Sequence, residues 1–73
     1  MDRGVAARVL EVTLHQGEEL TTLLADMTGR IEPQEYQHLK RAVARVLGHL
    51  FVEIIRPVVR EHPDLRPAGM DEP

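Results

Sequence analysis

The sequence predicts an all-α protein, an antiparallel hairpin of two helices that pairs with a second hairpin to form a four-helix bundle. Apolar residues recur at helical spacing on both sides of one short break. The break contains a glycine and then a proline, the order that ends one helix and begins the next. Since the chain has only 73 residues, it buries too little surface to build a large core alone.

The first helix is expected over residues 5–27. Its apolar positions at helical spacing are Ala6, Leu10, Leu20, Leu24 and Met27. Gly17 lies in the middle of this segment, where glycine costs about 1 kcal/mol relative to alanine. It either lets another helix approach closely or marks a kink, and we favour the close approach.

The break between the helices is short and has clear end signals. Gly29 suits the left-handed position just after a helix, and Pro33 suits the first turn of the next one. Ile31 and Tyr36 have the spacing of a hydrophobic staple around the start of the second helix. Glu32 is a poor N-cap, so this boundary can move by a residue or two. A loop of this length makes the two helices antiparallel neighbours.

The second helix is expected over residues 33–62. Its main apolar stripe consists of Leu39, Val43, Val46, Leu47, Leu50, Ile54 and Val58, and the stripe is widened by Phe51, Ile55 and Val59. One facing helix covers less than this width, so the stripe predicts burial against a second hairpin as well. The residues expected to carry self-association are Leu39, Val43, Leu47, Leu50, Phe51, Ile54 and Ile55.

Pro57 interrupts the second helix, because it removes a backbone donor and clashes with the preceding turn. We expect a kink with a continued helix, since the apolar pattern extends beyond Pro57. The alternative is a strand over residues 50–59, a segment rich in β-branched residues. Residues 63–73 are expected to form an extended, partly disordered tail on which Leu65 docks against the bundle.

Composition argues against most chemistry. The chain has no cysteine, which excludes disulfides, a thiolate zinc site and a cysteine nucleophile. It also lacks serine nucleophile motifs and glycine-rich phosphate loops. Tyr36 and Phe51 are the only aromatic residues, too few for a base-stacking platform. We therefore expect neither enzymatic activity nor a cofactor.

Two polar patterns define alternative functions. Glu35 and His38 form an E-x-x-H motif, which in di-iron bundles binds metal together with a further carboxylate from another helix. A solvated first-turn Glu beside a surface His is the simpler interpretation.

The second pattern is basic. The residues of this possible nucleic-acid face are Arg41, Arg45, Arg56 and Arg60. The expected dimer resembles in outline the plasmid RNA-binding hairpin dimers of the Rop type. This resemblance concerns architecture, with no motif residue matched, and it implies a helix face turned toward RNA. The net charge of −3 opposes nucleic-acid binding by the chain as a whole.

No signal peptide or membrane span is recognisable, so a bacterial cytoplasmic protein without membrane contact is expected. The function that fits is a small, non-enzymatic interaction or adaptor protein that forms a homodimer and offers a surface to another protein.

Overall fold

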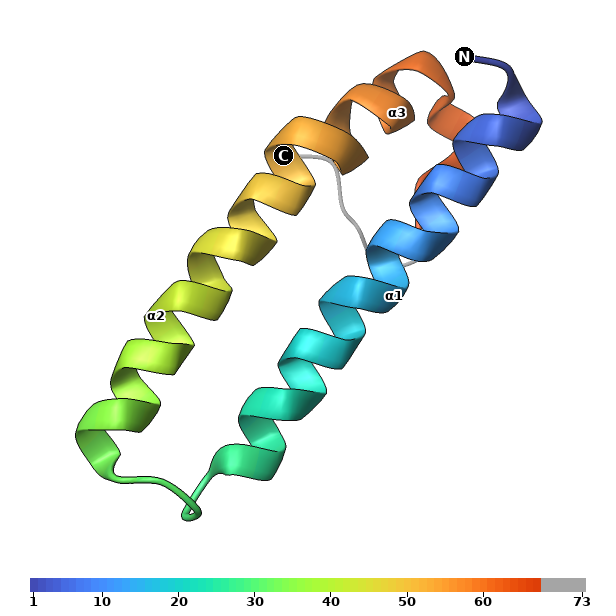
Figure 1. Ribbon diagram of the computed structural model, residues 1–73. Helices are drawn as coiled ribbons and strands as arrows, with labels where there is room; N and C mark the ends of the chain where they lie inside the picture. Colours follow the sequence, from blue (N-terminus) through green and yellow to red (C-terminus); the bar gives the residue numbers. More distant parts are fainter. Residues whose placement is uncertain (68–73) are drawn as a thin grey trace.

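The computed structural model describes residues 1–67, and these residues form helices joined by short connections without any strand. Two long antiparallel segments lie side by side (Figure 1). The elements are α1 (Arg3–Met27), α2 (Pro33–His49), the π-helix η1 (Leu50–Ile55), α3 (Arg56–Glu61) and the 3₁₀ turn η2 (Pro63–Leu65). The expected all-helical class is confirmed. Pairing of two hairpins stays a prediction, and residues 68–73 of the expected tail lie outside the described residues.

α1 begins at Arg3, two residues before the expected start, because Asp2 caps it. The Asp2 carboxylate accepts the backbone N–H groups of Gly4 and Val5, at 2.8 and 3.4 Å. These donors have no partner inside a helix, so an acidic N-cap stabilises this end.

The turn after α1 follows the signals of the sequence. Gly29 has φ of 79°, the left-handed conformation that residues with a side chain rarely adopt. The backbone N–H of Arg30 donates to the carbonyl of Met27 at 3.0 Å. At the start of α2 the Glu35 carboxylate accepts the N–H of Glu32 at 3.1 Å, which closes the first turn beside Pro33.

The backbone stays helical through Pro57, so the alternative of a strand over residues 50–59 is wrong. The turn that precedes Pro57 is widened to a π-helix, in which the N–H of Arg56 reaches five residues back to the carbonyl of Phe51. Pro57 has no N–H to donate, and its ring presses on the carbonyl four residues earlier. A wide turn relieves both problems, and such turns are a known device for changing the phase of a helix.

The π-helix changes which residues face α1. Ile54 continues the spacing of the apolar stripe of α2, yet it is only half-buried. Ile55 is buried instead, and Val58 and Val59 follow it into the interior. Part of the extra width of the apolar stripe on the second helix thus arises because the π-helix rotates the side of the helix that faces α1.

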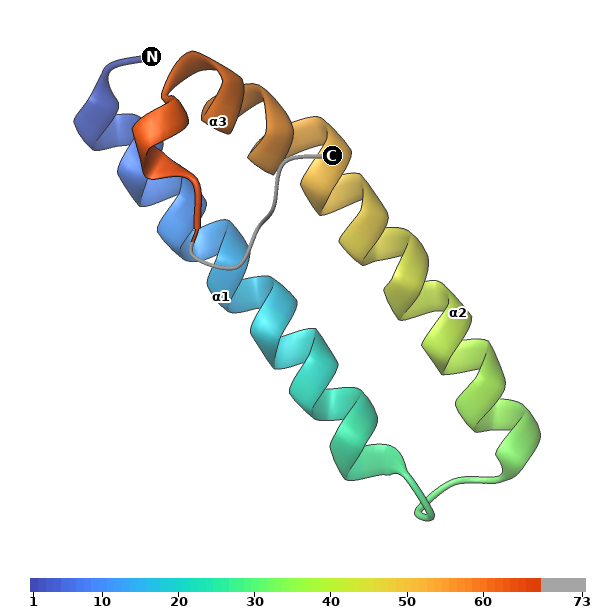
Figure 2. The ribbon, with the colours of Figure 1, turned by 180° about the vertical axis from the view of Figure 1, so that it is seen from behind.

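The core lies at the end of the hairpin away from the loop. Its buried members are Ala6, Leu10, Ile55, Val58 and Val59. Leu65 packs against this cluster, and Figure 2 shows the segment after α3 lying beside the first half of α1. Toward the loop the contact between α1 and α2 is thinner, with Val43 buried and Leu24 and Leu39 half-buried.

Polar contacts join the beginning of α1 to the segment after α3. Arg3 donates to the Asp64 carboxylate at 2.6 Å, and a ring nitrogen of His62 lies 2.9 Å from the carbonyl oxygen of Met1. The hydrogen bond and the charge of Arg3 hold the pKa of Asp64 below its ordinary value. These contacts close the open end of the hairpin over the small core.

Candidate interaction surfaces

Gly17 lies on the line where α1 meets α2. α1 is helical without interruption through this residue. A Cβ atom at Gly17 would lie 3.5 Å from Cδ2 of Leu47, an ordinary contact distance. The helices therefore meet at this height, and their packing leaves room for an alanine.

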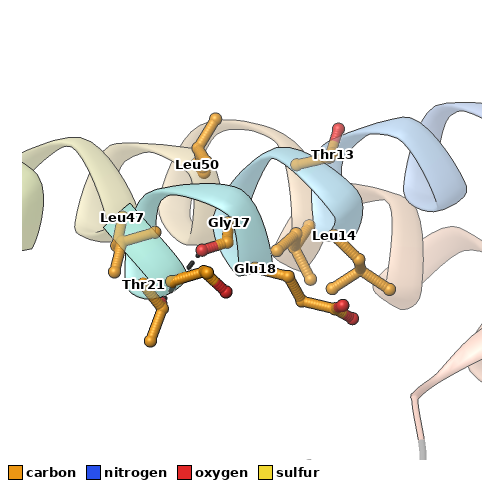
Figure 3. Close-up of a pocket in the computed structure, with 9 residues that line it drawn as sticks. Thr13, Leu14, Gly17, Glu18, Thr21, Leu47 and Leu50 are labelled. Carbon is orange, nitrogen blue, oxygen red and sulfur yellow. Dashed lines mark hydrogen bonds between the residues drawn. The ribbon is translucent and has the colours of Figure 1, made fainter. Parts of the chain in front are cut away.

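A groove runs between α1 and η1 beside this contact (Figure 3). It encloses about 440 Å³. Its lining residues include Leu14, Gly17, Thr21, Leu47 and Leu50, and Glu18 is the one titratable side chain on its wall. The Thr21 hydroxyl donates to the carbonyl of Gly17 at 3.0 Å, so it is occupied within its own helix. Such a groove suits an apolar side chain better than it suits acid–base chemistry.

A second surface, here called the flank face, consists of Val5, Val12 and Leu23 of α1 and Val46 of α2. These side chains are 40–50% exposed. The three α1 residues are separated by seven and eleven positions, both close to whole helical turns, so they form one line. In the sequence, Val5, Val12 and Leu23 broaden the apolar stripe of the first helix, but the pattern alone does not show that the second helix leaves them exposed.

The residues expected to carry self-association lie in different environments. Val43 and Ile55 are buried inside the hairpin. Half-buried positions are Leu39, Leu47, Leu50 and Ile54. Phe51 is 41% exposed, and the guanidinium of Arg56 stacks over its ring at 5.7 Å from the centroid. A partner chain would therefore meet the exposed flanks of the expected stripe more than its centre.

The four arginines of the possible nucleic-acid face are all exposed. Arg41 and Arg45 lie one turn apart on α2, and Arg56 and Arg60 lie one turn apart on α3. Within residues 1–67, the ion pairs lie along α1 or near the two ends of the chain, and none joins α1 to α2. The charges of α2 are thus open to another molecule.

One residue of the E-x-x-H motif, Glu35, stabilises the start of its own helix. The Glu35 carboxylate caps its own helix, and His38 is exposed. Within the part of the chain that the structure describes, no three His, Cys, Asp or Glu side chains gather as a metal site would require. His49, which the sequence placed beside a long apolar run, is exposed as well.

Among the helices of residues 1–67, none combines the length and the apolar character needed to cross a bilayer. Comparisons of the chain with protein-family models, with curated proteins and with solved structures found no match.

Proposed function

We propose that this chain is a small, non-enzymatic helical interaction module of the cytoplasm that associates with a second copy of itself to complete its core. The observation that supports this proposal is the flank face, a line of large apolar side chains left 40–50% exposed on both helices. Exposed large apolar side chains gathered on one side of a protein commonly mark interaction sites.

The energetics of a single hairpin favour such an arrangement. Two helices share one contact line, and within residues 1–67 the buried cluster has five members, with Val43 buried apart from it. Burial of a large apolar side chain contributes about 1.5–3 kcal/mol relative to leaving it exposed. A second hairpin would cover Val5, Val12, Leu23 and Val46 in both copies, so one contact would add eight partly buried side chains to a core that is otherwise small.

A pair of matched variants tests the proposal. Val46 belongs to the flank face, whereas Val52 lies in η1, outside that face, and is equally exposed, at 45% against 46%. We expect Val46→Glu to weaken the dimer by at least about a hundredfold, because it buries a charge in each copy of an apolar interface. Val52→Glu should leave the dissociation constant within about twofold. Equal effects of the two substitutions in sedimentation equilibrium would contradict the flank face as the interface.

A second candidate function uses the basic face. Arg41 and Arg45 project from α2 one turn apart, and α2 carries three bases and one acid. This arrangement can contact phosphates, so RNA or DNA is the partner to test. Binding should fall steeply between about 50 and 200 mM salt and vanish in the double variant Arg41→Glu/Arg45→Glu. Binding of RNA or DNA that does not weaken with salt would contradict a phosphate-binding role for the basic face.

A further inference from the structure

The exposed large apolar residues of α1 and α2 occupy the same side of the hairpin. Each one comes directly before a residue of the helix–helix contact: Val12 precedes buried Thr13, and Val46 precedes Leu47. Successive residues of a right-handed helix turn by about 100° in one sense. In two antiparallel helices that face each other, a residue one position before a contact residue therefore lies on the same side of the hairpin in both helices. Antiparallel coiled coils show the same relationship, because equivalent flanking positions of the two helices lie on one side.

The two helices differ in charge. α1 carries four acids and two bases, for a net charge of −2. α2 carries one acid and three bases, for a net charge of +2. A second hairpin on the flank face can place α1 against α1 and α2 against α2, or it can place α1 of each copy against α2 of the other. The opposite net charges of α1 and α2 favour contact between α1 and α2.

We infer that the second copy binds the flank face with its loop at the same end of the bundle, so that α1 of each copy lies against α2 of the other. This inference rests on the proposed self-association and specifies its geometry. All four neighbouring helix pairs are then antiparallel and of opposite charge. With the loops at opposite ends, α1 would lie against α1 and α2 against α2, and both pairs would repel.

The contact between Gly17 and Leu47 fixes which residues meet. In the inferred dimer α1 has the same height against α2 of the second copy as against its own α2. Glu19, two residues after Gly17, then lies opposite Arg45 of the second copy, two residues before Leu47. Both side chains are exposed, and helical spacing places them beside the flank face. Glu19 also lies 3.7 Å from His15 of its own helix, an exposed contact that leaves it accessible.

Asp26 and His38 repeat this relationship one heptad nearer the loop, and both are exposed. The twofold symmetry of the dimer forms each of these contacts twice. The rim of the inferred interface therefore pairs acidic α1 positions with Arg45 and His38 of the other copy's α2.

The loop position gives a direct test, because the chain has no cysteine. A nitroxide attached to Arg30→Cys, at an exposed turn residue, reports the distance between the two loops by pulsed electron paramagnetic resonance. We expect a distance of roughly 10–20 Å, the spacing of neighbouring helices plus the label arms. A dimer with a distance approaching the 45 Å length of the hairpin would overturn the inferred arrangement while leaving self-association intact. A monomer by sedimentation would overturn both.

Charge reversal supplies the second measurement. Glu19→Arg and Arg45→Glu should each weaken the dimer about tenfold at low salt, because each change affects two symmetric contacts. Together they should return the dissociation constant to within about twofold of the parent chain. Additive losses in the double variant would contradict the contact between Glu19 and Arg45.

Discussion

Gly29 shows most directly how one residue determines the hairpin. Its φ of 79° is strained for any residue with a Cβ atom, and this turn reverses the chain between α1 and α2. Gly48 is the natural contrast, because it lies inside α2 without positive φ and a Cβ atom there would meet nothing within 4 Å.

We therefore expect Gly29→Ala to destabilise the fold by about 1–2 kcal/mol. Gly48→Ala should instead stabilise it by about 0.5–1 kcal/mol, because alanine loses less backbone entropy in a helix. Chemical denaturation followed by far-UV circular dichroism measures both changes. Similar effects of the two substitutions would argue against the left-handed turn.

Asp64 is the residue whose titration reports the closure of the open end. Arg3 lowers the pKa of Asp64 in the folded chain, so its contribution to stability is present at neutral pH. That contribution is lost as the pH falls from the ordinary carboxyl range through the lowered pKa. A carbon-13 NMR titration of the Asp64 carboxyl should show a lower midpoint in the parent chain than in Arg3→Gln. Identical midpoints would contradict the contact.

At the scale of elements, the π-helix η1 decides how α2 and α3 use one apolar stripe. A regular α-helix that continued the phase of α2 would bury Ile54 and leave Ile55 at the edge. The wide turn before Pro57 reverses this preference, and Ile55 joins the core with Val58.

The matched pair of isoleucines tests this change of phase. Ile55→Ala should cost about 2–5 kcal/mol of unfolding free energy, the usual range for truncating a buried aliphatic side chain. Ile54→Ala should cost clearly less, because Ile54 is half-buried. Urea denaturation of the two variants gives the comparison. A larger loss for Ile54→Ala would indicate a regular α-helix through this segment.

The same element shows what the sequence could and could not predict. The helical class and the turn at Gly29 follow from local signals, because spacing and conformational preference act over a few residues. The width of the stripe on the second helix allowed two physical causes, a second partner or a change of phase. A residue pattern cannot separate them, since a π turn shifts the phase by one residue and broadens any helical projection.

The candidate surface was predictable only in part. The sequence emphasised the stripe of the second helix, of which Val43 and Ile55 turn out to be buried within one chain. The exposed line of Val5, Val12 and Leu23 depends on where α2 and Leu65 cover α1, and that is a property of the folded pair. The spacing in the sequence aligns these three residues on one side of α1, but it does not show that they remain exposed to solvent in the folded hairpin.

For the whole molecule, the core is small and lies at one end. Within residues 1–67, five buried residues cluster beside Leu65, while toward the loop Val43 is buried and Leu24 and Leu39 are half-buried. A domain of this size without disulfides usually gains its remaining stability from association. Folding and self-association should therefore be linked, and stability should rise with protein concentration.

Sedimentation equilibrium of the purified chain, with far-UV circular dichroism on the same samples, shows whether the hairpin folds by pairing with a second copy. We expect a helical dimer whose dissociation on dilution is accompanied by loss of helix. A well-folded helical monomer that persists across the accessible concentration range would contradict it.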